Sequence, residues 1–197
     1  MRYHLKAPPH AGADREGDAE DQVLITHTLS TLPGTLGVGE DYYVYSTESG
    51  YTEEMCLAQG IEKVTVDNYL PICGYDMIIL PKDTTFEDPS FCIYVRVKSD
   101  SDLGVDNLKA LDESTFQFVA DALVSGFSAM GEPIAHTVYE NENGKYIVFD
   151  AVLYKNARRY ATIINGKMVY FIAEAAGADI SDEQDRQIRL LIDALRY

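Results

Sequence analysis

The sequence lacks most of the features that would assign a chemical activity at once. It contains only three cysteines, Cys56, Cys73 and Cys92, an odd number without a closely spaced pair. These thiols alone build neither a disulfide framework nor a four-thiolate zinc site, and we expect them to be buried or idle. No stretch approaches the roughly 18 apolar residues that are needed to span a bilayer, so no membrane insertion is expected.

Positive charge is also scarce. The chain has 16 lysines and arginines against 32 aspartates and glutamates, which gives a net charge of −16. A surface of this sign repels phosphate backbones and anionic membranes, so we expect no nucleic-acid partner. The preferred interpretation is a solvated acidic surface, and the sign of the charge alone does not identify a ligand. Because 46% of the residues are apolar and 24% are charged, we expect a folded globular protein.

Histidine is rare as well, which limits the ways of building a nucleophile and its base. Of the four histidines, His4 and His10 lie near the N-terminus. His136 alternates with Ile134 and Val138 along a predicted strand, so we expect a packed or half-buried side chain there. No serine lies in a G-x-S-x-G motif. The sequence therefore assigns no catalytic, cofactor-binding or metal-binding residue, and no cofactor is expected.

One loop offers several carboxylates to a hard cation. Asp100, Asp102 and Asp106 lie close together. The EF-hand template fails, however, because Val105 replaces the required glycine and Leu111 stands where the bidentate glutamate should be. We prefer a solvated acidic turn and leave cation binding around Asp100 and Asp102 open.

Residues 1–21 differ in composition from the rest of the chain. They combine Pro8 and Pro9 with five acidic residues and have almost no large apolar side chain after Leu5. We expect a disordered leader over residues 1–21 and a single α/β domain over residues 22–197. No apolar stretch follows the first residues, so no signal peptide is expected.

Alternating apolar residues predict strands in the first half of the domain at 23–29 and 41–46, joined by a glycine-rich turn over 33–39. Gly37 and Gly39 begin like a dinucleotide-binding fingerprint, but the sequence after them reads as a strand, and a turn is the better interpretation. Residues 47–60 are expected to form a polar loop.

Further along, helical spacing predicts helices over 61–73 and 112–130. Gly131 and Pro133 are expected to end the second helix. The segments 75–80 and 91–98 read as neighbouring strands.

The C-terminal third predicts a four-stranded antiparallel meander closed by a helix. The expected strands are 134–139, 145–154, 159–164 and 168–173. Asn143-Gly144 and Asn165-Gly166 separate them as hairpin turns. Ser181 to Gln184 fits a capping box that opens an amphipathic helix. The stripe on this helix consists of Ile188, Leu191, Ile192 and Leu195.

This order of elements resembles the Mog1/PsbP-like fold. The resemblance rests on the hairpin at 165–167, the helix opening at 181–184 and the chain end at 192–197. The segments 41–45, 60–61 and 69–70 also make residues 23–197 similar to uncharacterised proteins of gut Firmicutes. The Mog1/PsbP-like resemblance implies an α+β fold, in which an antiparallel sheet is flanked by helices in an α/β sandwich.

Members of this fold group are mostly accessory, binding or assembly factors, and fold alone does not transmit a function. Many bacterial relatives are secreted or membrane-anchored, whereas this sequence shows neither signal nor anchor. The location therefore stays open between a soluble protein as it reads here and an extracytoplasmic one without its targeting segment.

Two surface features favour contact with a protein. Lys155, Arg158 and Arg159 form the compact basic cluster of the sequence, although balancing nearby acids is the preferred role. Seven tyrosines precede the long predicted helix and would be adhesive if exposed together, although core packing is preferred. They are Tyr42, Tyr43, Tyr45, Tyr51, Tyr69, Tyr75 and Tyr94.

The sequence leads to two main functional hypotheses, and a purely structural domain of a larger extracytoplasmic assembly is a third that sequence alone does not separate from the first. The first is a non-enzymatic binding or assembly module that engages a protein partner. The alternative is a small hydrolase or small-molecule-binding protein whose site is assembled from distant residues. A pocket that holds His136 or several converging carboxylates would favour the alternative.

Overall fold

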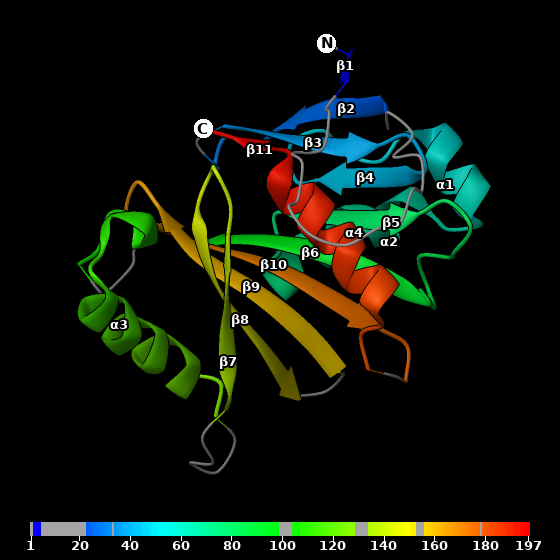
Figure 1. The fold of residues 1–197 in the computed structure, drawn as a ribbon. Helices are drawn as coiled ribbons and strands as arrows, with labels where there is room; N and C mark the ends of the chain where they lie inside the picture. The colour runs from blue at the N-terminus through cyan, green and yellow to red at the C-terminus, as the bar shows by residue number, and fades with distance from the viewer. Residues whose placement is uncertain are drawn as a thin grey trace, which may run out of the picture.

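The computed structural model describes residues 2–4, 23–32, 34–98, 104–128, 134–152, 156–177 and 179–197. Within these ranges the chain has an α+β fold with two antiparallel sheets and four α-helices (Figure 1). This confirms the expected fold class, although a second sheet was not predicted.

A seven-stranded antiparallel sheet forms the centre of the molecule. Its strands are β4 (Tyr42–Ser46), β5 (Met77–Pro81), β6 (Phe91–Lys98), β7 (His136–Glu140), β8 (Lys145–Val152), β9 (Asn156–Ile164) and β10 (Lys167–Ala175). They lie in the order β4-β5-β6-β10-β9-β8-β7. The predicted meander is therefore confirmed as the run β7 to β10, and β5 and β6 pair as expected.

The hairpin between β9 and β10 shows why this register forms. Asn165 and Gly166 both have positive φ angles, of 49° and 74°. A two-residue turn of this conformation matches the right-handed twist of the flanking strands, and asparagine followed by glycine adopts it at low cost. The turn pairs Lys167 with Ile164 and sets the register of the two most buried strands.

The second sheet is smaller and joins distant parts of the chain. Its strands are β1 (Arg2–His4), β2 (Val23–Thr28), β3 (Thr35–Gly39) and β11 (Leu195–Arg196), in that order. The prediction of a turn over 33–39 is wrong, because Thr35–Gly39 pairs with β2 on one side and with β11 on the other. Within the expected leader, Arg2–His4 pairs with β2, and the remainder of residues 1–21 lies outside the described residues.

The helices are α1 (Glu53–Gln59), α2 (Lys63–Cys73), α3 (Glu113–Ser125) and α4 (Asp182–Asp193), with a short 3₁₀ turn at Leu108–Ala110. The prediction of a loop over 47–60 is wrong in its second half, where α1 forms. The helix predicted over 112–130 ends earlier, at Ser125, and the expected stop at Gly131 and Pro133 lies outside the described residues. The capping box of α4 is confirmed.

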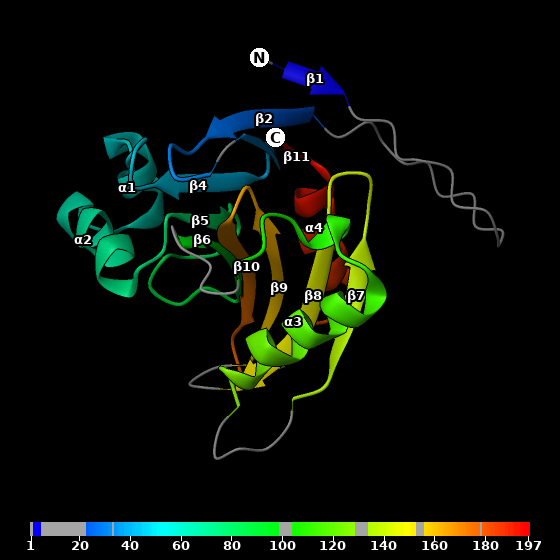
Figure 2. The ribbon, with the colours of Figure 1, turned by 90° about the vertical axis from the view of Figure 1, so that its left-hand side faces the viewer.

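The helices divide between the two faces of the large sheet (Figures 1 and 2). One core lies between the sheet and α1, α2 and α3, and includes Leu70 and Phe116. The other lies between the opposite face, α4 and the small sheet, and includes Leu36 and Ile188. Alternating side chains along each strand supply both cores. None of the helices in the described ranges combines the length and the apolarity that crossing a membrane requires.

Candidate functional site

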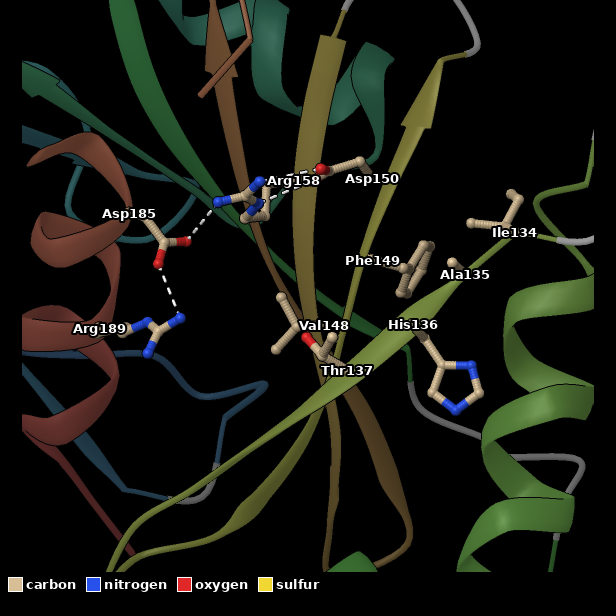
Figure 3. A pocket seen from close by; sticks show the side chains of 10 residues that line it. All are labelled: Ile134, Ala135, His136, Thr137, Val148, Phe149, Asp150, Arg158, Asp185 and Arg189. Carbon is tan, nitrogen blue, oxygen red and sulfur yellow. Dashed lines mark hydrogen bonds and ion pairs between the residues drawn. The ribbon is translucent and has the colours of Figure 1, made fainter. Parts of the chain in front are cut away.

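A groove of about 420 Å³ lies between α4 and the edge strand β7. Strands β8 and β9 contribute Val148, Asp150 and Arg158, and α4 contributes Asp185 and Arg189. Figure 3 shows the charged side chains of these elements meeting on one side of the groove. Arg158 and Asp185 are 27 residues apart in sequence, so only the fold brings them together.

The two aspartates and two arginines form one continuous network. Arg158 donates two hydrogen bonds to the carboxylate of Asp150, of 2.8 and 2.9 Å, and a third of 3.0 Å to Asp185. Asp185 also accepts a bond of 2.7 Å from the Tyr160 hydroxyl and pairs with Arg189 at 2.9 Å. The formal charges of the two aspartates and two arginines cancel, and their bonds join α4 to β8 and β9.

The titration of Asp185 follows from these contacts. Burial by itself raises the pKa of this carboxyl, but the hydrogen bonds from Tyr160 and Arg158 and the two arginine charges outweigh it. The pKa of Asp185 therefore lies below its ordinary value. Bonds to Asp150 and Asp185 hold the pKa of Arg158 above its ordinary value.

These shifts predict a pH dependence of stability. Because the folded-state pKa of Asp185 is below the unfolded value of about 3.9, its contribution to the free energy of unfolding is complete above that pH. The contribution is lost as the pH falls through the folded pKa. Urea unfolding of the wild type and of Asp185→Asn between neutral and strongly acid pH measures this. The two free energies should converge in acid, and a constant difference would contradict the assignment.

His136 does not join this network. Its side chain is largely buried and turned toward α3, where Nε2 lies 3.2 Å from the amide of Gln117 and Nδ1 lies 3.9 Å from Asp121. The prediction of a packed histidine agrees with this placement. The groove therefore touches His136 without receiving its imidazole, and both carboxylates in the groove are bound to arginines.

The basic cluster that the sequence predicted does not lie on one face of the sheet. Arg158 and Arg159 are neighbours on β9 and point to opposite faces. Arg158 balances Asp150 and Asp185, as preferred from the sequence, whereas the guanidinium of Arg159 is buried 5.2 Å from the ring of Phe127. Burial lowers the pKa of Arg159. Lys155 lies outside the described residues.

The seven N-terminal tyrosines pack inward, and none is exposed. Tyr45, Tyr51 and Tyr94 are buried. Tyr75 stacks on Tyr94 with ring centroids 4.4 Å apart, and burial raises the pKa of Tyr75 to about 12. The hydroxyl of Tyr69 lies 3.3 Å from that of Tyr94. Six of the tyrosines thus belong to the core under α1 and α2, Tyr42 packs against the opposite core, and an adhesive tyrosine patch does not form.

Three large aliphatic side chains are instead exposed on the outer side of α1 and α2. Leu57 on α1 is 82% exposed, and Val64 and Ile72 on α2 are 58% and 82% exposed. Three of the four most exposed large apolar side chains of the described residues thus belong to two adjacent helices. We call Leu57, Val64 and Ile72 the α1–α2 apolar surface.

Helix geometry explains why these side chains face solvent. With about 100° per residue, Val64, Asn68 and Ile72 lie on the side of α2 opposite to Val66 and Leu70, which are fully buried. Helix α2 therefore presents two large apolar side chains, Val64 and Ile72, on its otherwise polar solvent side.

Sequence reasoning missed this surface because it missed α1. The signals were present: Thr52 caps the helix by accepting a bond from the Met55 amide, and Gly60 ends it in the left-handed conformation. A threonine followed by two glutamates, with a glycine eight residues after the threonine, marks both ends of a short helix.

The structure does not test the cation binding that the sequence left open around Asp100 and Asp102. Among the described residues, no three His, Cys, Asp or Glu side chains gather closely enough to hold a metal ion. Asp100 and Asp102 lie outside those residues. Cys56 and Cys92 are buried and Cys73 is partly buried, and none of the three forms a disulfide with another cysteine.

Comparison with known proteins finds one kind of likeness. No protein-family model and no curated protein matches the chain. Among solved structures, the chain is similar to the cyanobacterial PsbP protein (CyanoP) of Synechocystis sp. PCC 6803, at 10% sequence identity and a TM-score of 0.45. The match covers 94% of this chain and 98% of that one. The likeness is one of fold alone.

The neighbour is a PsbP protein, and the Mog1/PsbP-like fold is the one that the sequence resembles. The expected similarity to gut Firmicutes proteins finds no support in these comparisons. At this identity and TM-score, the likeness carries no argument about activity or partners. The functional argument therefore rests on the residues of this chain.

Proposed function

We propose that this protein is a non-enzymatic binding or assembly module that engages a protein partner through the α1–α2 apolar surface. The observation that carries the proposal is the exposure of Leu57 and Ile72, each 82%. Single exposed leucines are common on protein surfaces, but several on adjacent helices mark an interaction site.

The energetics of burial support this role. Covering a leucine or isoleucine side chain stabilises a complex by about 1.5 to 3 kcal/mol. Leu57 and Val64 flank the three-residue connection between α1 and α2, and Ile72 lies two helical turns beyond Val64. The three side chains thus supply anchors along one helix and the end of its neighbour, which is the pattern of a helical binding surface.

The cores beneath the surface make it rigid. Cys56 and Gln59 on the inner side of α1, and Val66 and Leu70 on that of α2, are buried. The side chain of Gln59 accepts a bond of 2.9 Å from the amide of Phe86 and so attaches α1 to the β5–β6 loop. A surface held in this way does not have to be ordered when a partner binds, which favours affinity.

Site-specific photo-crosslinking tests the proposal. A photoreactive amino acid is placed at position 57 or at position 72, and a third variant carries it at Phe118, an equally accessible residue of α3 that is 72% exposed. After irradiation in an extract of the producing cells, we expect one partner to crosslink from positions 57 and 72 and not from 118. Different proteins at the two positions, or equal yield at 118, would contradict the proposal.

The double variant Leu57→Ser/Ile72→Ser gives the quantitative test with that partner. We expect its affinity to fall by at least about tenfold, because two apolar anchors are lost. The midpoint of thermal unfolding should stay nearly unchanged, since both side chains are exposed in the free protein. Titration calorimetry measures the affinity, and Phe118→Ser is the matched control. An unchanged affinity of the double variant would show that the partner binds elsewhere.

A further inference from the structure

The charged residues around the α1–α2 apolar surface indicate which kind of partner it binds. Glu53 and Glu54 lie one helical turn before Leu57, and Glu62 lies two residues before Val64. All three glutamates are exposed, and none forms an ion pair within the part of the chain that the structure describes. The surface therefore has an acidic rim without its own counter-charge.

A nearby acid shows the contrast. Asp67 accepts two hydrogen bonds from Lys63, of 3.0 and 3.2 Å, so this pair contributes no net charge to the rim. The uncompensated charge is thus carried by the first turn of α1 and by the N-cap of α2.

Helix stability accounts for only some of these glutamates. Glu53 and Glu54 lie in the first turn of α1, where negative charge interacts favourably with the helix dipole. Glu62, in contrast, occupies the N-cap of α2 and its side chain forms no capping hydrogen bond. Serine, threonine, aspartate or asparagine would cap α2 better, so helix formation does not explain a glutamate at this position.

We infer that the α1–α2 apolar surface binds a cationic amphipathic segment of another protein, in which apolar side chains are flanked by lysine or arginine. This inference rests on the proposed function. Apolar anchors supply the affinity, and basic residues at the edge of the segment pair with Glu53, Glu54 and Glu62. Charges of opposite sign at the rim raise the association rate and suppress acidic partners.

The same charges argue against other occupants. In a two-fold dimer each copy presents the same surface, so a second copy would place three unpaired glutamates against an identical set. Anionic lipid surfaces and nucleic acids would be repelled in the same way. A basic protein segment is the occupant that complements both the apolar centre and the acidic rim.

Two synthetic peptides test the inference. Both are helical with the same leucine face, and their polar faces consist of lysine in one peptide and glutamate in the other. Fluorescence anisotropy at low and high salt measures their binding to the wild type and two variants. One variant is Leu57→Ser/Ile72→Ser. The other is Glu53→Gln/Glu54→Gln/Glu62→Gln, which removes the acidic rim.

We expect the lysine peptide to bind the wild type and the glutamate peptide not to bind. The apolar double variant should weaken binding by about tenfold or more. The rim variant should weaken it by about fivefold at low salt and reduce the salt dependence. A control with the same change in net charge, Glu140→Gln/Glu142→Gln/Asp182→Asn on β7, its hairpin and α4, should change binding by less than about twofold.

The possible outcomes distinguish the proposed docking surface from the proposed cationic partner. Equal binding of both peptides that depends on Leu57 and Ile72 would overturn the cationic segment and leave the docking surface standing. Equal weakening by the rim variant and its control would overturn the local role of the glutamates. Insensitivity of both peptides to the apolar variant would overturn the surface itself. Self-association of the protein that the apolar variant abolishes would identify a second copy as the occupant.

Discussion

Replacing Gly34 by alanine should lower the free energy of unfolding by about 3 kcal/mol or more. Gly34 has a φ angle of +139°, which side chains rarely allow, and an added Cβ would lie 2.1 Å from the carbonyl oxygen of Arg196. Arg196 belongs to β11, whose neighbour is β3. The methyl group would therefore push the C-terminal strand off the small sheet, because neither backbone has room to move cheaply.

Urea unfolding followed by circular dichroism measures this effect. Gly60→Ala is the matched control, because Gly60 also has a positive φ angle, of +64°, but an added Cβ would meet nothing within 4 Å. The control should lose about 1 kcal/mol from backbone strain alone. Equal losses in the two variants would show that the added methyl group at position 34 does not displace β11.

Replacing Asp185 by asparagine should lower the free energy of unfolding by about 2 kcal/mol at neutral pH. The side chain of Asp185 is only 13% exposed and contacts Arg158, Tyr160 and Arg189 at once. An amide of the same size keeps the packing but removes the charge that both arginines face. The variant thus leaves two partly desolvated guanidinium groups without their shared counter-charge.

Asp150→Asn provides the comparison for this prediction. Asp150 also binds Arg158, through two hydrogen bonds, but its side chain is 60% exposed. Its loss should cost only about 0.5 kcal/mol, because water screens an exposed pair and replaces it. If Asp150→Asn destabilises the protein as much as Asp185→Asn, burial does not decide the strength of this network.

Local sequence signals predicted the elements that local interactions build. Ser181 and Gln184 cap α4 through side-chain bonds to nearby backbone, and Asn165 with Gly166 adopts the positive φ angles that its turn requires. These signals act over a few residues, so the sequence shows them directly. The sequence also places Ile188 and Ile192 on one side of α4, and both are buried.

Elements stabilised by distant partners were missed. The segment Thr35–Gly39 contains two glycines, Gly37 and Gly39, yet it forms β3 because β2 and β11 supply hydrogen bonds on both sides. Glycine has weak strand propensity, and tertiary pairing outweighs it here. Helix α1 has only seven residues, too few to be stable alone, and depends on the core that Cys56 enters.

The candidate sites show the same division. The sequence identified His136 as a packed residue and Arg158 as a cation that nearby acids balance. It did not identify those acids, because Asp150 lies on another strand and Asp185 on α4. Their proximity depends on how β8, β9 and α4 pack together. Residue spacing along the chain does not show this packing.

By itself, the sequence determined an acidic α+β chain with a C-terminal meander, two correctly placed hairpin turns and a capped final helix. Periodicity and turn chemistry act between neighbouring residues, which is why these features can be read along the chain. Only the tertiary structure decided that the tyrosines are buried and that Leu57, Val64 and Ile72 remain exposed. Exposure depends on which face of each element another element covers, and that is settled by contacts between residues far apart in sequence.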